Sequence, residues 1–204
     1  MKITVKFFSL LTLCLTLILS TELSAKSMNE IDAAIESSLT RFTEEIQGGD
    51  SYLEGARGVL VIPRMWKAGV VLGFEFGEGA LIVDDVKVQY YKALTTSLGI
   101  QVGVGSKDLI ILFFDDTAMD NFLYSSGWEV GVDGAVALFP LGAAGAADTN
   151  TFKDAIVGFV FGQKGLIAGI SMEGTKFTKI WPDTGTEIDQ DQEDIETFNE
   201  RLTD

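Results

Sequence analysis

The stretch GVLVIPRMWKAGVVLGFEFGEGALIVDDVKV, residues 58–88, places apolar side chains at every second position. This period of two is typical of β-strands with one buried face. One such apolar series consists of Val70, Leu72, Phe74 and Phe76. The polar pair Asp84-Asp85 predicts a hairpin turn, because aspartate tolerates the backbone angles of tight turns. The same period continues to residue 180 and includes a predicted alternating strand over residues 98–104.

Glycine is abundant on the second faces of these strands, and the chain of 204 residues contains 22 glycines. Glycine inside a strand marks a bulge, strong coiling or the close approach of another backbone. We therefore expect a strongly twisted, mostly antiparallel, barrel-like β-sheet. GFEFGEGAL at residues 73–81 resembles GFVFGQKGL at residues 158–166, which predicts two equivalent hairpins.

Two helices are predicted beside the sheet, which makes the fold class α+β. Ser27 and Glu30 have the spacing of a capping box, and a helical stripe of apolar residues follows. The stripe consists of Ile31, Ile35, Leu39, Phe42 and Ile46. This pattern predicts an amphipathic helix over residues 28–47. A short inserted helix is expected after Asp115-Asp116-Thr117, where capping residues precede an apolar stripe.

The N-terminal segment has the pattern of a secretory signal peptide. Lys2 and Lys6 precede the apolar residues 7–19, and small residues follow up to Ala25, after which we expect cleavage. The apolar run is shorter than the roughly 20 residues that span a bilayer. An uncleaved anchor is the alternative, whereas Leu13 disfavours lipoprotein processing at Cys14. The expectation is a periplasmic or secreted protein.

Three segments are therefore expected: a signal peptide at residues 1–25, a single domain at residues 26–182 and an acidic tail at residues 183–204. The tail has nine acidic residues and one arginine, a composition typical of a solvated segment.

Composition excludes several classes of function. The chain has 15 Lys and Arg against 30 Asp and Glu, no histidine and one cysteine, which lies in the expected signal. Catalytic triads with histidine, imidazole or thiolate metal sites and disulfides are therefore not expected in the mature protein. Such acidity disfavours nucleic acid, and no nucleotide-binding glycine motif occurs. We expect no enzyme activity, catalytic residue, metal or cofactor.

Carboxylates leave one catalytic alternative open, a metal-dependent or carboxylate hydrolase. Asp115, Asp116 and Asp120 could hold Mg²⁺ or Ca²⁺, although helix capping explains the same residues. Glu75 and Glu78 could form the carboxylate pair of a glycoside hydrolase, or they could be two exposed acids.

A cationic stretch stands out in the acidic chain. Residues 55–74 contain Arg57, Arg64 and Lys67 and no acid, with Trp66 among them. A tryptophan flanked by bases can enter a lipid headgroup region while the cations meet phosphates. The alternative is that Trp66 packs inward and the bases pair with acids. A weaker basic group is Lys164, Lys176 and Lys179.

Five segments together resemble the SYLF domain family over residues 31–180. They are GARGVLVIPRMWKAG, GFEFGEGALIV, SLGIQVGVGSKDLIILFF, GWEVGVDGAVAL and FVFGQKGLIAGISMEGTKFTKI. The resemblance implies a non-enzymatic phospholipid-binding module, and in eukaryotic members also phosphoinositide and actin binding. Those members use a basic amphipathic N-terminal helix, whereas residues 28–47 here carry five acids and one arginine.

The leading hypothesis is a lipid-binding or membrane-binding module of the cell envelope. The resemblance makes Arg57, Arg64 and Lys67 candidates for headgroup contact, with Trp66 beside them. The alternative is an envelope scaffold that binds a protein partner through its acidic tail or its sheet surface.

Overall fold

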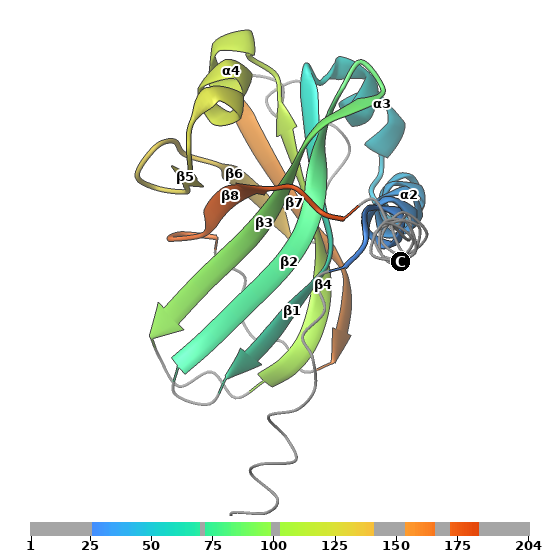
Figure 1. Cartoon of the computed structure of the whole chain (residues 1–204). Coiled ribbons are helices and arrows are strands. Elements are labelled where there is room, and N and C mark those ends of the chain that lie inside the picture. The colour runs from blue at the N-terminus through green and yellow to red at the C-terminus, as the bar shows by residue number, and fades with distance from the viewer. Residues whose placement is uncertain (1–25, 70–71, 99–102, 141–153, 166–171, 184–204) are drawn as a thin grey trace, which may run out of the picture.

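One curled half-barrel sheet of eight strands organises the molecule (Figure 1). The computed structural model describes residues 26–69, 72–98, 103–140, 154–165 and 172–183. The strand order is β5-β8-β3-β2-β1-β4-β7-β6, and only β6 and β7 pair in parallel. Three helices accompany the sheet in these ranges. The expected α+β class with a mostly antiparallel, barrel-like sheet is confirmed.

The described ranges contain three helices and eight strands. The helices are α2 (Met28–Glu45), α3 (Gly49–Gly55) and α4 (Asp116–Tyr124). The strands are β1 (Gly58–Gly69), β2 (Leu72–Val83), β3 (Val86–Leu98), β4 (Gly103–Phe113), β5 (Trp128–Glu129), β6 (Ala137–Pro140), β7 (Ile156–Gly165) and β8 (Lys176–Ile180).

The capping box at the start of α2 is confirmed. The Ser27 hydroxyl accepts from the Glu30 backbone N–H, and the Glu30 carboxylate accepts from the Ser27 N–H at 3.0 Å. The helix ends at Glu45, two residues before the predicted end. The short helix α3 was not predicted, because its seven residues begin at a glycine and carry no apolar stripe.

The sheet has a hydrophobic core on each face. One face, here the α2 face, packs Val61, Ala80 and Ile110 beneath α2 and α3. The other, here the α4 face, packs Leu60, Leu81, Tyr91 and their neighbours against α4 and β5. Adjacent residues of one strand therefore belong to different cores, as the period of two requires.

Glycine allows the strands to approach each other closely where β1 changes register against β2. A Cβ added to Gly79 would lie 1.7 Å from the carbonyl oxygen of Val61, a separation that no side chain tolerates. The expected role of strand glycines is thus realised here. GFEFGEGAL runs inside β2 without a turn, so the predicted pair of equivalent hairpins is wrong.

The turn at Asp84-Asp85 is confirmed between β2 and β3. Both residues have positive φ angles, 48° and 62°, as the common two-residue hairpin turn requires. The strand predicted over residues 98–104 falls mainly on residues 99–102, which lie outside the described residues, whereas Leu98 ends β3 and Gly103 begins β4. These strands lie apart, with β2 and β1 between them.

The expected signal at residues 1–25 and almost all of the expected tail lie outside the described residues. In the described ranges, no helix combines the length and the apolar character needed to cross a bilayer.

Candidate functional site

Five exposed apolar side chains gather on the α2 face, beyond the part of the sheet that α2 covers. We call this group the apolar patch. It consists of Trp66, Phe74, Phe76, Leu94 and Val104, whose exposed fractions are 57%, 53%, 41%, 44% and 68%. They are half of the ten large exposed apolar residues in the described ranges. Their grouping on four adjacent strands makes this a surface of its own.

Strand register brings the patch together. Trp66 of β1 lies opposite Phe76 of β2, which lies opposite Leu94 of β3. In the next row, Ala68 lies between Phe74 of β2 and Val104 of β4. Residues opposite each other on neighbouring strands project from the same face at close spacing. The patch is therefore continuous across the sheet.

Trp66 belongs to a row of residues that are paired across neighbouring strands, and a lysine lies at each end of this row. Lys164 of β7 is paired in register with Ser106 of β4, which is the neighbour of Trp66. Lys176 of β8 is paired with Leu94, and beyond it lies Glu129 of β5. Both lysines are exposed. The apolar patch is thus bordered by cations that belong to other strands.

A bulge in β1 places Trp66 on this face. Pro63 and Arg64 together lie opposite Asp108, because the register of β1 against β4 shifts between Ile62 and Met65. Arg64 has a φ of 48°, and its backbone N–H donates to Asp108 Oδ1 at 2.8 Å. Its side chain is exposed.

Asp108 also binds the helix that covers the sheet. The Arg41 guanidinium of α2 donates to Asp108 Oδ2 through Nε at 2.9 Å and also through Nη2. The side chain of Asp108 is only 3% exposed. One buried carboxylate therefore fixes both the bulge and the position of α2.

Lys67, a predicted headgroup contact, lies on the opposite face and is buried. Its ammonium is 3.0 Å from Glu75 Oε1, and Lys107 Nζ is 2.6 Å from Glu75 Oε2. All three side chains are at most 7% exposed. Lys67 is therefore separated from Trp66 by the sheet and forms part of a buried ion triad.

Arg57, another predicted contact, lies just before β1 and nine residues before Trp66 in the sequence. Its Nε is 3.6 Å from Asp116 Oδ1, and both side chains are largely exposed. Of the four candidate residues, the structure brings Trp66 and Arg64 to one end of the α2 face. Arg57 and Lys67 lie elsewhere.

The structure does not support the carboxylate sites. Glu75 faces the buried triad, whereas Glu78, three residues along the same strand, faces the α2 side near Lys26, 4.0 Å away. Two carboxylates on opposite faces cannot flank one glycosidic bond. Asp115 caps α4 by accepting from the Ala118 N–H at 2.8 Å. In the described part of the chain, no three acidic groups are arranged to hold a metal.

Sequence reasoning missed four members of the patch. Phe74 and Phe76 belong to an apolar series that the period of two assigns to a buried face, yet here they are exposed. The inward positions beside them are Gly73, Glu75 and Gly77. No local signal indicated this exposure, because a face of Gly73, Glu75 and Gly77 that alternates with phenylalanines is the usual pattern of an exposed face opposite a buried one.

Residues 94–181 match the family model Ysc84, described as a Las17-binding protein actin regulator. This part of the chain is therefore similar to the Ysc84 (SYLF) family. No curated protein matches the chain.

The Ysc84 region contains only part of the sheet. It begins at Leu94 near the end of β3 and includes β4 to β8. The two central strands β1 and β2 lie outside it, although they separate β3 from β4 in the sheet. The apolar patch therefore combines Leu94 and Val104 of the Ysc84 region with Trp66, Phe74 and Phe76 of the preceding strands.

Proposed function

We propose that the protein is a non-enzymatic module of the cell envelope that binds lipid surfaces through the apolar patch. The observation that carries the proposal is the row of exposed apolar side chains from Trp66 to Leu94, bordered by Lys164 and Lys176. The similarity of residues 94–181 to the Ysc84 (SYLF) family supports the non-enzymatic part of the proposal, because that family is generally non-catalytic.

The composition of the patch suits a bilayer interface. Tryptophan favours the headgroup level, where its ring is apolar and its N–H is hydrated, and phenylalanine and leucine can enter the acyl boundary.

The charges around the patch favour an anionic leaflet. Arg64, Lys164 and Lys176 are exposed at its border, and each base near an anionic surface contributes about 1 kcal/mol. This local attraction opposes the repulsion due to a chain of formal net charge −15. We expect the apolar contact to dominate, so that salt weakens binding without abolishing it.

The helix α2 is unsuited to the contact. Its exposed residues include Glu30, Glu36, Glu44 and Glu45, and an anionic leaflet repels such a surface. The proposed contact is therefore the uncovered end of the sheet, with α2 acting as the support that holds the sheet through Arg41 and Asp108.

Vesicle flotation tests the proposal. The mature chain, expected to be residues 26–204, is mixed with phosphatidylglycerol-containing or pure phosphatidylcholine vesicles at low and physiological salt. We expect flotation that is strongest with anionic vesicles. Burial of a large apolar side chain contributes about 1.5 to 3 kcal/mol, so Trp66→Ala should weaken binding about tenfold or more.

The matched control is Trp181→Ala, because Trp181 is also exposed, at 81%, but lies outside the patch. It should float like the wild type. Absence of flotation with every vesicle, or equal loss from Trp66→Ala and Trp181→Ala, would refute the proposal. Secretion of the chain with loss of residues 1–25, detected by N-terminal sequencing, tests the proposed envelope location.

A further inference from the structure

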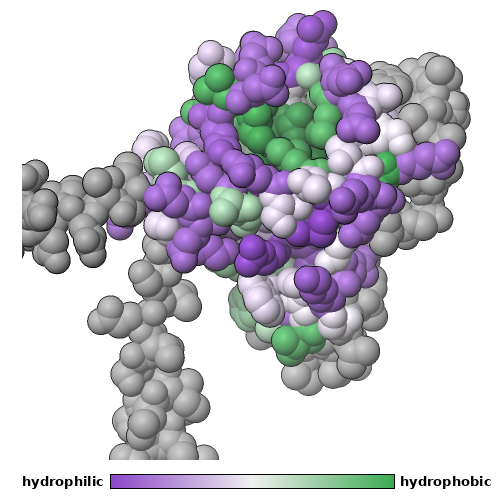
Figure 2. All heavy atoms as spheres, turned by 90° about the vertical axis from the view of Figure 1, so that its right-hand side faces the viewer, coloured by the Kyte–Doolittle hydropathy of each residue, from purple (hydrophilic) through white to green (hydrophobic). Residues whose placement is uncertain are grey.

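A pocket opens at the other end of the α2 face, where α2, α3 and the β2–β3 hairpin meet. Figure 2 shows an apolar hollow ringed by hydrophilic residues on the side of the molecule that carries these helices. The volume of the pocket is about 370 Å³, within the usual range for ligand pockets. It is lined by Leu39, Leu53, Glu54, Ala56, Arg57, Gly58, Val59, Ile82, Asp84 and Asp85.

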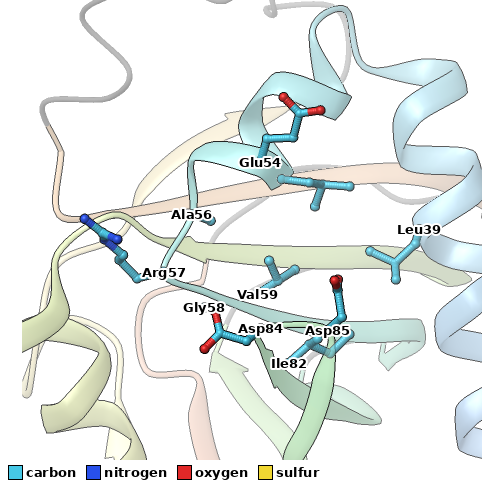
Figure 3. Close-up of a pocket in the computed structure, with 10 residues that line it drawn as sticks. Leu39, Glu54, Ala56, Arg57, Gly58, Val59, Ile82, Asp84 and Asp85 are labelled. Atoms are coloured by element: carbon cyan, nitrogen blue, oxygen red, sulfur yellow. The ribbon is translucent and has the colours of Figure 1, made fainter.

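The apolar lining comes from four parts of the chain. Leu39 belongs to α2 and Leu53 to α3, while Val59 and Ile82 are opposite each other on β1 and β2. In Figure 3, Leu39 and Arg57 lie at opposite ends of this space, with Glu54 on one side and the two aspartates on the other. The four apolar side chains are only partly buried, so they present an apolar surface to an incoming group.

The rim of the pocket is acidic. Glu54, Asp84 and Asp85 are exposed, and none of these three carboxylates has an ion-pair partner in the part of the chain that the structure describes. The one base of the lining, Arg57, is engaged by Asp116 at 3.6 Å. The rim therefore keeps an excess of negative charge.

The positions of the two aspartates are fixed by the hairpin. Both have positive φ angles in a two-residue turn between paired strands. Their backbone is thus held in place by the register of β2 and β3 and needs no rearrangement to accept a ligand. Such preorganisation reduces the entropy lost on binding.

We propose that this pocket docks a basic segment of a partner protein, with an apolar side chain in the hollow and lysine or arginine at the rim. Charge complementarity selects this occupant. An anionic headgroup and the chain's own acidic tail are repelled by the three carboxylates, and a small cation alone leaves the apolar lining exposed. The proposal does not depend on the function of the apolar patch.

A labelled peptide with two leucines between two pairs of lysines tests the proposal by fluorescence anisotropy, without lipid, on the mature chain. Two control peptides carry serines in place of the leucines or glutamates in place of the lysines. We expect saturable binding of the first peptide only. Equal binding of the serine peptide, or binding of the glutamate peptide, would overturn the proposal.

The double variant Asp84→Asn with Asp85→Asn removes two rim charges. Asparagine tolerates positive φ, so the turn is retained, which circular dichroism and the Tm can verify. We expect about fivefold weaker binding, in line with exposed charge pairs worth 0.2 to 1 kcal/mol each. The matched control, Glu36→Gln with Glu44→Gln, removes the same charge from exposed positions of α2 outside the pocket and should leave binding unchanged.

The binding position is checked independently by methyl NMR. On addition of the leucine-lysine peptide, the methyl signals of Leu39, Leu53, Val59 and Ile82 should shift, whereas those of Leu94 and Val104 should not. Shifts confined to the latter pair would contradict the proposal. If the double variant bound the peptide normally but adhered more strongly to anionic vesicles, the rim would be a membrane-repelling surface, and the docking proposal would be wrong.

Discussion

The buried carboxylate of Asp108 accepts a hydrogen bond from the backbone N–H of Arg64 at 2.8 Å, across the bulge that turns Trp66 onto the α2 face. Its second oxygen binds the guanidinium of Arg41 in α2. The same side chain therefore satisfies the backbone N–H of the bulge and attaches the helix to the sheet. The exposure of Trp66 depends on this contact, since the bulge sets which face each following residue of β1 occupies.

Replacement of Asp108 by alanine should lower the free energy of unfolding by about 3 kcal/mol, because it leaves a largely buried guanidinium and a backbone N–H without their acceptor. Asp108→Asn should cost less, since the amide oxygen can still accept from Arg64. Urea unfolding measures both variants. Asp116→Ala, which breaks the exposed pair with Arg57, should change stability by less than about 0.5 kcal/mol. Equal effects of Asp108→Ala and Asp116→Ala would contradict the role assigned to Asp108.

The buried triad should respond asymmetrically to mutation. Glu75→Gln leaves two buried ammonium groups without a counter-charge and should cost about 3 kcal/mol or more. Lys67→Met leaves the pair of Glu75 and Lys107 intact, 2.6 Å apart, and should cost much less. Chemical denaturation compares the two. The order of the effects is the test, and a larger loss from Lys67→Met would refute it.

Lys67→Met also tests whether the bases of the cationic stretch contact lipid phosphates or pair with acids. Because Lys67 is buried on the α4 face, its loss should not alter vesicle binding by the folded protein. Arg64→Ala should weaken binding to anionic vesicles and reduce its dependence on salt. Vesicle titrations at two salt concentrations measure both effects. Reduced binding by a fully folded Lys67→Met protein would restore Lys67 as a headgroup contact.

Tryptophan fluorescence should report contact with the bilayer. In a Trp181→Phe protein, the emitters in the described ranges are the exposed Trp66 and the buried Trp128, which is 3% exposed. Addition of anionic vesicles should shift the emission to shorter wavelength as the Trp66 ring leaves water. The shift should disappear when Trp66→Phe is added to this protein. A shift that persists in the double variant would exclude Trp66 from the contact.

Gly79→Ala should prevent formation of the native sheet. The new Cβ would lie 1.7 Å from the Val61 carbonyl oxygen. The Val61 backbone cannot move away without breaking the hydrogen bonds between β1 and β2. We expect a loss beyond about 4 kcal/mol, the range of severe core disruptions, measured by thermal unfolding and soluble yield. Gly127→Ala is the control, since its Cβ would meet the flexible Lys176 Cε at 3.3 Å and the Phe177 carbonyl oxygen at 3.7 Å, an ordinary van der Waals distance. A Gly79→Ala protein as stable as Gly127→Ala would contradict the close approach.

The two adjacent tyrosines of β3 should differ on removal of the hydroxyl. Tyr90 donates to Asp32 at 2.8 Å, so Tyr90→Phe should cost about 1 kcal/mol. The buried Tyr91 hydroxyl has no hydrogen-bond partner in the described ranges, so Tyr91→Phe should be neutral or stabilising. Urea unfolding at pH 7 measures both. The reverse order would contradict these contacts.

The same tyrosines should make the stability of the fold depend on pH in the alkaline range. Burial raises the pKa of Tyr91 to about 12, and burial together with the Asp32 hydrogen bond and charge raises the pKa of Tyr90 to about 12. In the unfolded chain, the tyrosine hydroxyl deprotonates near pH 10. The stability associated with the protonated phenols is therefore complete below pH 10 and is lost as pH rises toward 12. Unfolding of the wild type and of Tyr91→Phe from pH 9 to 12 should show a shallower loss in the variant.

Local signals in the sequence predicted most of the fold. The Ser27 and Glu30 capping box, the Asp84-Asp85 turn and the aspartate cap of α4 each depend on a few neighbouring residues. Such interactions can be deduced without knowledge of the tertiary structure. The glycine content indicated close backbone approach but could not identify the partner, since Gly79 meets Val61 only through strand pairing.

The site was less predictable, because exposure depends on what covers each face. Trp66 was identified from its basic neighbours, yet Lys67 beside it faces the other core. Strand alternation alone would have separated these two residues. Lys107, the third member of the triad, and Phe74, Phe76, Leu94 and Val104 of the patch become neighbours of the predicted residues only through the order of strands in the sheet.

The two ends of β2 carry opposite electrostatic character. Its C-terminal end leads to the unpaired carboxylates of Asp84 and Asp85, and Asp84 is about 26 Å along the strand from Phe76. Its N-terminal part contributes to the row that Lys164 and Lys176 border. In the field of an anionic bilayer, such a separation of charge produces a torque, because one end is attracted while the other is repelled. This torque would orient the protein with the apolar patch toward the bilayer before any side chain touches lipid. The rate of productive encounters would then depend on this alignment.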